Sequence, residues 1–470
     1  MKSFLLISLA LILAFPATAQ EWSEPVNVSN MDDFILKSDF TIDNAGVIHC
    51  VWNLKYDANY GVIYYARSED DGASWSEPVS ISQNQDLYCT SPQIVHDSQN
   101  RLYVGYDLND YSPQTWGSYA CLVIMDDPGW SEPLTLAEGI HTRMAVDNND
   151  RVYVFWLQGA PHNGEFCYQY LENGQLSQIF IPFDNFYELT VIWNIVVDNN
   201  NNLHCGGFYD PSGTSNAHPA YYEYNYAMQQ WNITMVSTGN STSDIDIALD
   251  TAQLPHICFG GNATYHTSLN GESWSIPDTI AFPDPYRVVI EVDKANKIHI
   301  ATTEEADNGI KLVYYHKSDG SNWESMIVDH GNNVIFTPEF KIFNNSLYVV
   351  YDKSNIVPQG DIYISKLDIL SSTFEYASSD ETLIEIYPNP FGTSTCVSYF
   401  LRGYNVVRLY IKDLDGKHIK TLVAEDQTEG NYMIFWDGTN DCMQRVPRGI
   451  YFCILTTNKH QFVKNILYLP

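Results

Sequence analysis

A pattern that recurs seven times constrains the fold of this chain more than any other feature. Each copy reads as a short apolar strand, a polar turn and a second apolar strand, as in "FTIDNAGVIHCVW" and "MAVDNNDRVYVFW". The turn aspartates of six copies lie about 43 to 54 residues apart, at Asp43, Asp97, Asp147, Asp198, Asp250 and Asp293. The seventh copy has a shorter turn, around Asn344 and Asn345. Self-similarity at such a period predicts a repeat architecture.

The content of each period indicates a β-propeller. Aspartate, asparagine and glycine suit tight turns because their side chains bond the local backbone or tolerate left-handed geometry. A third β-like run follows in most copies, and then a fourth that begins with tryptophan, as in "WSEPVSIS". Four strands per period of this length are typical of a propeller blade. The sequence therefore predicts an all-β fold with seven blades.

The two ends of the repeat complement each other. The seventh copy has no tryptophan-led outer strand, whereas Trp22 to Ser29 ("WSEPVNVS") is such a strand with no blade before it. We therefore predict that this N-terminal segment supplies the outer strand of the last blade and closes the ring. Closure removes open sheet edges that would otherwise be exposed.

The first residues predict export. Residues 1–19 combine one lysine, an apolar run and the small-residue pattern Ala17-Thr18-Ala19, which is typical of a signal peptide. The apolar run is shorter than the ~20 residues that span a bilayer. No later segment is apolar for that long, so no transmembrane segment is expected once the signal is removed.

Charge divides the rest of the chain. The whole sequence carries a formal net charge of −33. Residues 384–470 contain nine Lys and Arg against eight Asp and Glu, whereas the part before them, Lys2 aside, contains 14 basic against 49 acidic residues. This contrast predicts a propeller at 20–376, a linker at 377–383 and a separate domain at 384–470. Such acidity argues against nucleic-acid binding, which requires basic side chains to neutralise phosphates.

One turn carries a recognisable motif. The segment Ser68 to Trp75, "SEDDGASW", has Ser68, Asp70, Gly72, Ser74 and Trp75 at the positions of an Asp-box. The aspartate can accept hydrogen bonds from turn N–H groups, and the glycine supplies a positive φ. On this motif and the seven periods, the chain resembles the sialidase-like Asp-box (BNR-repeat) propeller superfamily. The resemblance implies the fold, and the box itself is a structural device.

The C-terminal segment contains short β runs separated by turns, which indicate a small β-sandwich. Its motifs "YPNPF" from Tyr387, "YIKD" from Tyr410, "WDG" from Trp436 and "GIYF" from Gly449 follow one another in order. On these motifs it resembles the C-terminal sorting domain of type IX secretion cargo, which is similar to the Ig-like domain of the flagellar hook-capping protein. The resemblance implies transport across an outer membrane by that machinery.

The nine cysteines include no C-x-x-C pair, so they indicate neither a zinc ribbon nor a dense disulfide framework. Cys50, Cys205 and Cys258 recur within apolar strands and are interpreted as core residues. A bridge between Cys396 and Cys453 is compatible with the sequence. No cofactor is expected to be required.

Polar residues interrupt the first strand of nearly every copy, four residues before the turn. They are Asp39, Gln93, Arg143, Asn194, Asp246 and Glu339, and the sixth copy instead has Arg287 and Glu291 on either side of Val289. Buried polar groups are costly unless paired. We consider two explanations: a polar, ligand-binding rim at the channel mouth, or a solvated entrance to each strand. Calcium would suit the oxygen donors of Asp39, Asp246 and Glu339.

Long loops on the face opposite the turns offer further ligand candidates, because binding residues often lie on loops held by a rigid scaffold. Tyr111, Trp116, Tyr209 and His218 lie there and could stack on sugar rings. Sialidase chemistry would require an arginine cluster, and the chain before the C-terminal domain has only five arginines. Ser38-Asp39-Phe40 also replaces the family's arginine segment at the start of the first blade.

These observations predict a protein that is secreted or held on the outer surface of a Gram-negative-type bacterium. The favoured function is non-catalytic recognition of a glycan or a surface protein, with no catalytic residue assigned. The alternative is an exo-acting, sialidase-like glycosidase or a polysaccharide lyase that uses the acidic residues of the channel mouth.

Overall fold

The computed structural model describes residues 22–369 and 384–469 apart from short stretches, mostly in loops, the longest being 112–116, 160–164, 184–188, 211–216, 238–243 and 318–322. The predicted signal peptide, 1–19, and linker, 377–383, lie outside the described residues. The chain divides into two compact units, Met1–Ser372 and Thr373–Pro470. Within the described residues all regular structure is β, and no helix long and apolar enough to cross a membrane is found.

The first unit consists of groups of antiparallel strands that follow one another along the chain. They are β2 (Phe34–Ile42), β3 (Ile48–Lys55), β4 (Gly61–Ser68) and β5 (Val79–Ser80); β6 (Tyr88–His96), β7 (Leu102–Asp110), β8 (Gly117–Asp126), β9 (Gly129–Trp130) and β10 (Leu134–Glu138); β11 (Ile140–Val146), β12 (Val152–Gln158), β13 (Glu165–Glu172) and β14 (Gln175–Leu176); β15 (Leu189–Val197), β16 (Leu203–Asp210), β17 (His218–Asn225) and β18 (Gln230–Met235); β19 (Asp244–Leu249), β20 (Pro255–Gly260), β21 (Thr264–Asn270), β22 (Ser273–Trp274) and β23 (Asp278–Ala281); β24 (Val288–Val292), β25 (Ile298–Ala306), β26 (Gly309–Lys317) and β27 (Glu324–Gly331); and β28 (Val334–Phe343), β29 (Ser346–Asn355) and β30 (Gln359–Asp368), joined by β1 (Val26–Asn27).

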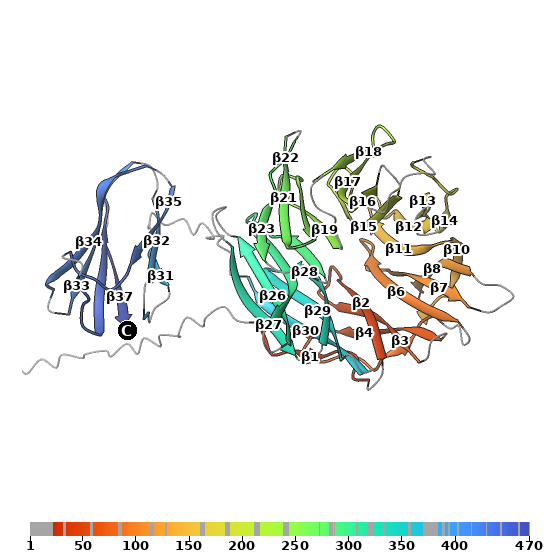
Figure 1. Ribbon diagram of the computed structural model, residues 1–470, viewed down its shortest axis with the longest axis horizontal. Coiled ribbons are helices and arrows are strands. Elements are labelled where there is room, and N and C mark those ends of the chain that lie inside the picture. The colour runs from red at the N-terminus through yellow and green to blue at the C-terminus, as the bar shows by residue number, and fades with distance from the viewer. Residues whose placement is uncertain are drawn as a thin grey trace, which may run out of the picture. The chain divides into compact units, whose positions relative to one another are not determined.

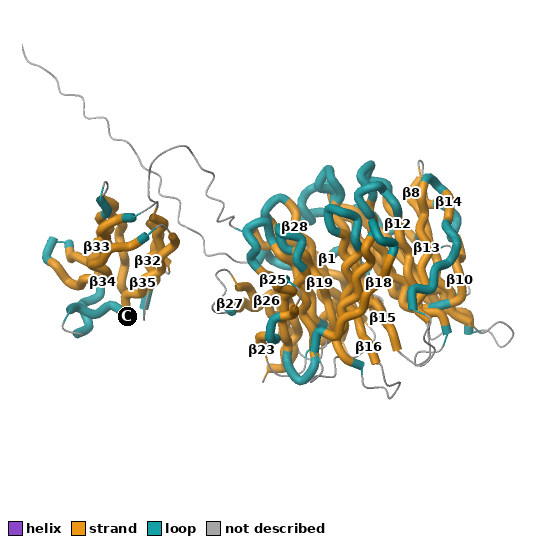
Figure 2. The backbone as a smooth tube through the Cα atoms, turned by 90° about the horizontal axis from the view of Figure 1, so that it is seen from above, coloured by secondary structure: helices purple, strands orange, loops and turns teal. Residues whose placement is uncertain are grey.

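The first strands of these groups surround a common centre (Figure 1). Each contacts the first strand of the next group, from β2 through β6, β11, β15, β19 and β24 to β28, and β28 contacts β2. The first two groups share a nine-stranded sheet through a single parallel bridge between Gly61 and Tyr88. This arrangement of mostly four-stranded sheets is that of a β-propeller. Figure 2 shows the strands running between two faces of loops.

The turn aspartates have the predicted role. Asp43 Oδ1 accepts hydrogen bonds from the N–H groups of Ala45 and Val47, both at 2.9 Å, and Gly46 has a positive φ of 86°. The five later turn aspartates accept the same pair of bonds. Each later turn also places a residue in the left-handed region, namely Asn100, Asp150, Asn201, Gln253 and Asn296.

The Asp-box residues make the hydrogen bonds expected of them. Asp70 accepts bonds from Ser68 Oγ, Ser74 N and Ser74 Oγ, at 2.9, 2.8 and 2.6 Å. Gly72 has a φ of 87°, and its carbonyl accepts a bond from Trp75 Nε1 at 3.2 Å. The box is therefore a self-contained hairpin turn, as the sequence predicted.

The predicted pairing of the N-terminal segment is confirmed. β1 pairs antiparallel with β30, with Val26 opposite Ile364. Val28 N donates to the carbonyl of Ile362 at 2.7 Å, and Ser29 Oγ accepts from the N–H of Ile362 at 3.1 Å. The earliest described strand thus joins the last strand of the first unit.

The second unit contains two antiparallel sheets. One has the order β31 (Ile384–Tyr387), β32 (Thr395–Leu401) and β35 (Gly430–Trp436), and the other β34 (His418–Gln427), β33 (Asn405–Asp413), β36 (Gly449–Thr456) and β37 (Gln461–Tyr468). One hydrophobic cluster, centred on Trp436, Tyr451 and Tyr468, takes residues from both sheets. The "WDG" motif has a structural reason, because Gly438 has a φ of 73° and a Cβ there would lie 2.7 Å from the Tyr468 ring.

The cysteines of the described structure are buried and free. They are Cys50, Cys89, Cys121, Cys167, Cys205, Cys258 and Cys453. The core interpretation of the repeated cysteines therefore agrees with the structure. Cys453 is free in this structure, and the side chain of Cys396 lies outside the described residues.

The pairing of β1 with β30 makes a prediction about stability. Deletion of residues 22–30 should lower the thermal unfolding midpoint by roughly 5–10 °C or more, because it leaves the edge of β30 unpaired and removes Trp22 from its contacts with Tyr314 and Phe340. Differential scanning calorimetry measures the change. A Trp22→Ala variant should show a smaller loss, and the exposed Glu24→Ala serves as the control. An unchanged midpoint in the deletion variant would contradict closure by this segment.

Candidate functional site

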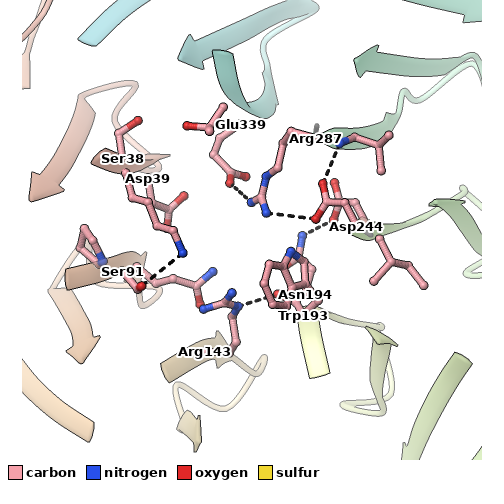
Figure 3. Close-up of a pocket in the computed structure, with 16 residues that line it drawn as sticks. Ser38, Asp39, Ser91, Arg143, Trp193, Asn194, Asp244, Arg287 and Glu339 are labelled. Carbon is pink, nitrogen blue, oxygen red and sulfur yellow. Dashed lines mark hydrogen bonds and ion pairs between the residues drawn. The ribbon is translucent and has the colours of Figure 1, made fainter. Parts of the chain in front are cut away.

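A cavity of about 230 Å³ lies where the first strands converge, toward the ends of those strands that are far from the turn aspartates. Its described lining comprises Lys37, Ser38, Asp39, Ser91, Pro92, Gln93, Arg143, Trp193, Asn194, Asp244, Ile245, Asp246, Arg287, Val288, Thr337 and Glu339. We call it the central pocket (Figure 3). The cavity is smaller than the ~300–1,000 Å³ of sites for drug-sized ligands, so it suits a small ligand or one unit of a larger one.

The structure brings together seven of the residues that the sequence pattern singled out. Asp39, Gln93, Arg143, Asn194, Asp246, Arg287 and Glu339 all line the central pocket. Glu291 does not line it. It lies two residues before the turn aspartate Asp293, nearer to the turns, where it interacts electrostatically with Lys341. Tyr111, Tyr209 and His218 are outside the pocket lining, and Trp116 lies outside the described residues.

β-bulges shape the mouth of the pocket. One extra residue interrupts the pairing of β2 between Ile35 and Ser38, and the same kind of register shift occurs in β6, β11 and β15. A bulge bends its strand and redirects side chains. In β6 the bulge contains Ser91, whose φ is 53°, and in β11 it contains His141, whose φ is 59°. Lys37, Ser91 and Trp193 enter the pocket lining at these bulges.

The polar residues of the first strands bond to the neighbouring strand. Asp39 Oδ2 accepts from Ile94 N, and Gln93 Oε1 accepts from Met144 N, both at 2.8 Å. Asp246 Oδ2 accepts from Ile290 N at 2.8 Å. These side chains satisfy backbone N–H groups that no further strand pairs. They are therefore inter-strand links as well as part of the pocket lining.

Arg287 is neutralised within the pocket. Its Nη1 lies 3.2 Å from Asp244 Oδ1 and its Nη2 lies 2.5 Å from Glu339 Oε1 (Figure 3). Asp244 also accepts from Val288 N at 2.7 Å, which fixes its carboxylate. These two ion pairs hold the guanidinium between two carboxylates from different strands.

Lys37 and Arg143 lack such partners. Arg143 donates to two backbone carbonyls, Nε to Trp193 at 2.6 Å and Nη1 to Thr142 at 2.8 Å, and its guanidinium lies 4.9 Å from the centre of the Trp193 ring. Lys37 Nζ donates to Ser91 Oγ at 3.3 Å. Within the described residues, no carboxylate lies within ion-pair distance of either group.

Burial perturbs the ionisation of this site. Burial, together with the charges of Arg143 and Arg287, lowers the pKa of Lys37 to about 8. Burial and the nearby Glu339 raise the pKa of Asp39 and of Asp246, each to about 6. Several groups with pKa values near neutrality thus lie in one small cavity, which is common at functional sites.

Some donors of the pocket have no protein acceptor. Ser38 Oγ, Trp193 Nε1 and Arg287 Nε are buried and form no hydrogen bond with the described residues. Ser38 is only 7% exposed. Unsatisfied buried donors are costly, so these three groups lower the stability of the structure around the pocket.

A second cavity of about 540 Å³ continues from the pocket along the channel. It shares Asp39, Gln93, Asn194 and Glu339 with the pocket and reaches Thr41, His96 and Lys341. Burial raises the pKa of Glu291 to about 7, although Lys341 opposes this effect. The nearby carboxyls, Glu291 first among them, raise the pKa of Lys341 against the effect of burial.

The proposed calcium ligands have other partners in this structure. Glu339 is paired with Arg287, and Asp39 and Asp246 accept backbone hydrogen bonds. Within the described part of the chain, no group of three or more His, Cys, Asp or Glu residues is arranged to hold a metal ion. Calcium binding stays a prediction.

The histidines that recur in the second strands are part of the packing. His49 Nδ1 lies 2.8 Å from Tyr65 OH, and its Nε2 lies 3.4 Å from Asp43 Oδ2. At the same position of the next copy, Tyr103 OH donates to Asp97 at 3.0 Å. Either side chain thus bonds the turn aspartate, which explains why the two alternate.

Sequence reasoning missed much of the pocket lining. It did not single out Lys37, Ser91, Trp193 or Asp244. Lys37 and Trp193 line the pocket because they lie in β-bulges. A bulge changes the face of the sheet on which a side chain lies, and no sequence pattern announced these bulges. Asp244 could have been found from "DIDIAL", in which two aspartates alternate with apolar residues at the start of a strand.

The fold and the pocket together define a β-propeller with a mixed-charge cavity at its centre. No protein-family model and no curated protein matches the chain by sequence. Among solved structures, it is similar to the PL25 polysaccharide lyase, an ulvan lyase, with a TM-score of 0.57, 14% identity and coverage of 72% of this chain and 95% of that one. A second structure of that lyase is bound to -[GlcA(1-4)Rha3S]- and matches equally well.

The chain is also similar to PorZ of Porphyromonas gingivalis, described as an essential bacterial surface component of the type IX secretion system. That match has a TM-score of 0.51 and 14% identity, and it covers 95% of this chain and 60% of PorZ. Identities this low show the fold alone.

The raised pKa of Glu291 makes a prediction about pH. Because its folded-state pKa of about 7 exceeds its ordinary value of 4.5, the folded protein holds an extra proton between these pH values, and the free energy of unfolding should fall as pH rises through this window. Glu291→Gln mimics the protonated form. Urea unfolding should be measured at pH 4.5 and at pH 8. From the lower to the higher pH, the free energy of unfolding of the variant should rise by about 1–3 kcal/mol relative to that of wild type. A pH-independent difference would contradict the shift.

Proposed function

We propose that the protein is a secreted or cell-surface β-propeller that binds an acidic sugar unit of a glycan in the central pocket without cleaving it. The observation that carries this proposal is the pair Lys37 and Arg143, two cations in one cavity with no carboxylate partner among the described residues. Arg143 is only 6% exposed, and a buried cation without a counter-charge is costly, whereas Lys37 is exposed and open to a ligand. A ligand carboxylate or sulfate would supply the missing negative charge.

The rest of the pocket suits the remainder of a sugar. Ser91, Gln93 and Asn194 bring hydroxyl and amide groups to the lining, and Asp39 and Asp246 bring carboxylates that ligand hydroxyls could contact. Convergent polar groups of both kinds are what a polyhydroxylated ligand requires. The similar ulvan lyase binds a chain that contains glucuronic acid and sulfated rhamnose, which agrees with an acidic ligand class.

Several features favour recognition over hydrolysis. Arg287 is already neutralised by Asp244 and Glu339, and the described lining contains no tyrosine to act as a nucleophile. A sialidase-like site would use an arginine cluster and such a tyrosine. A surface protein is a less well supported ligand for the same face than a glycan, since nothing in the pocket suits a peptide better than a sugar.

A polysaccharide lyase is the second candidate. The observation that favours it is Lys37, whose pKa of about 8 leaves a share of free amine at neutral pH that could act as a general base. The fold shared with the ulvan lyase agrees with this candidate, but a shared fold is no evidence for lyase activity.

We further infer that the strand groups of the first unit are seven blades of one closed ring. We also propose that residues 384–470 form an Ig-like sorting domain that directs the protein through a type IX-like secretion system. The fold shared with PorZ along nearly the whole chain supports this, as do the ordered motifs of the second unit. The predicted signal peptide would provide the first export step.

The binding proposal predicts the effect of neutralising either cation. Isothermal titration calorimetry of wild type with glucuronic acid, an ulvan-derived disaccharide, neutral glucose and calcium should show binding of the acidic sugars only. Lys37→Met and Arg143→Gln should each weaken that binding by about tenfold or more, because each removes a charged contact. Lys294→Met, on an exposed turn at the other face, is the matched control.

The same samples separate the candidates. Absorbance near 232 nm reports the unsaturated uronates that a lyase releases from ulvan, and the proposal predicts no increase. An increase that Lys37→Met abolishes would establish the lyase instead. Equal binding of glucose and glucuronic acid, or no binding of any sugar, would overturn the acidic-glycan proposal.

The sorting proposal predicts where a truncated protein accumulates. A variant that ends at residue 383 should keep a folded propeller but remain in the periplasm, because the two units have separate hydrophobic cores. Cell fractionation with immunoblotting of the native host measures this. Substitution of the exposed Phe435 by alanine within the full-length chain controls for general effects on export. Arrival of the truncated protein at the surface or in the medium would contradict a sorting role.

A further inference from the structure

We propose that a cluster of tyrosines beside the central pocket forms a second sugar-binding subsite, so that the protein prefers a chain of several sugar units over a single one. We call this cluster the tyrosine platform and define it as Tyr56, Tyr60, Tyr64, Tyr88 and Tyr111. The inference rests on the proposed glycan-binding function and deepens it by naming the length of ligand that the site selects.

The platform is built from two neighbouring strand groups. Tyr56 and Tyr60 flank the loop between β3 and β4, and their rings stack with centroids 5.1 Å apart. Tyr56 OH lies 2.9 Å from Tyr64 OH. Tyr88 begins β6, and its ring lies 6.2 Å from that of Tyr111, which follows β7.

Backbone contacts hold the two halves side by side. Gly61, next to Tyr60, forms the parallel bridge to Tyr88, and its N–H donates to the carbonyl of Leu87 at 3.3 Å. A Cβ at Gly61 would lie 2.7 Å from the Tyr88 ring, so this ring packs directly on the backbone of the first group. Tyr88 is itself only 9% exposed, so it packs the two groups together, and Tyr56 and Tyr111 supply the exposed rings.

The platform adjoins the pocket. Tyr88 and the pocket residue Ser91 lie three residues apart on the same strand, β6. At ~3.3 Å per residue, this spacing places the platform roughly 10 Å outward from Ser91, on the side of the long loops. A glycan whose acidic unit contacts Lys37 and Ser91 could therefore continue over the tyrosines without a change in the protein.

The exposed rings have the chemistry that sugar rings require. Tyr56 is 49% exposed and Tyr111 is 43% exposed, although large hydrophobic side chains are mostly buried in this unit. Tyrosine presents an apolar ring face and a polar tip, which suits the apolar face of a pyranose and its hydroxyls. The stacked pair Tyr56 and Tyr60 loses little conformational freedom when a ligand binds, since the rings already hold each other.

Lys55 strengthens the preference for an acidic chain. Lys55 is the last residue of β3, and its Nζ lies 5.5 Å from the centre of the Tyr88 ring. An ammonium over an aromatic face is retained near the surface. It would attract a second carboxylate or sulfate along the same chain.

The test compares ligands of increasing length by calorimetry. The probes are glucuronic acid and ulvan-derived di-, tetra- and hexasaccharides, titrated into full-length wild type, Tyr56→Ala, Tyr111→Ala and the double variant. Wild type should bind the tetrasaccharide at least about tenfold more tightly than glucuronic acid. Each single variant should lose about threefold of that gain and the double variant about tenfold, which is the whole gain, because each ring contributes its own stacking contact.

Control variants isolate the stacking contribution. Tyr56→Phe and Tyr111→Phe keep the rings and should retain most of the tetrasaccharide affinity. Tyr404→Ala removes an exposed tyrosine of the second unit, 62% exposed, and should have no effect. Glucuronic acid should bind all platform variants as it binds wild type, since the pocket is unchanged.

The outcomes separate this inference from the proposed function. If glucuronic acid binds but longer chains bind no more tightly, or if the alanine variants leave the length preference intact, the platform is not a subsite. If the variants weaken glucuronic acid and tetrasaccharide equally, the tyrosines only support the pocket and the inference is overturned. If no saccharide binds, both the proposed function and this inference are overturned.

Discussion

The structure depends on how the inner edges of the first strands satisfy their backbone N–H groups. These edges face the central channel, where no further strand can pair with them, and an unpaired buried N–H is costly. The side chain of one strand therefore serves the backbone of the next: Asp39 bonds Ile94 N, and Gln93 bonds Met144 N. Asp246 does the same for Ile290. The polar residues that interrupt these apolar strands are thus required by the fold, whether or not they also bind a ligand.

This requirement also produces the site. The side chains that bond neighbouring strands, such as Asp39, Gln93 and Asp246, also line the central pocket. The β-bulges add Lys37 and Trp193 to the pocket lining. In a regular strand, the alternation of side chains would point such residues away from the pocket. Because fold and site use the same positions, substitution of Asp39 or Asp246 would disturb stability and binding together. Arg143 likewise bonds the backbone, through the carbonyls of Trp193 and Thr142, whereas the side chain of Lys37 bonds only Ser91 Oγ, which makes Lys37 the cleaner probe of function.

The sequence predicted what local patterns determine. The turn aspartates, the Asp-box and the pairing of the N-terminal segment with β30 each depend on a few neighbouring residues or on a missing repeat element. Seven pocket residues were found because a polar residue in an apolar strand is conspicuous. The bulges and Trp193 were not found, because register shifts depend on pairing with a distant strand. Several expected long loops are also shorter, since strands such as β29 (Ser346–Asn355) continue into them.

Charge is distributed unequally between the surface and the pocket. The chain carries a net charge of −33, yet the central pocket brings together Lys37, Arg143 and Arg287, which include two of the five arginines that precede residue 384. At physiological ionic strength the repulsion of an acidic ligand by distant surface carboxylates is screened beyond about 8 Å, whereas contacts inside the cavity are screened far less. An acidic ligand would therefore meet little long-range attraction and would be selected at short range. Selection at short range requires shape and hydrogen bonding as well as charge, and the polar side chains of the lining, such as Ser91, Gln93 and Asn194, are placed to supply such bonds.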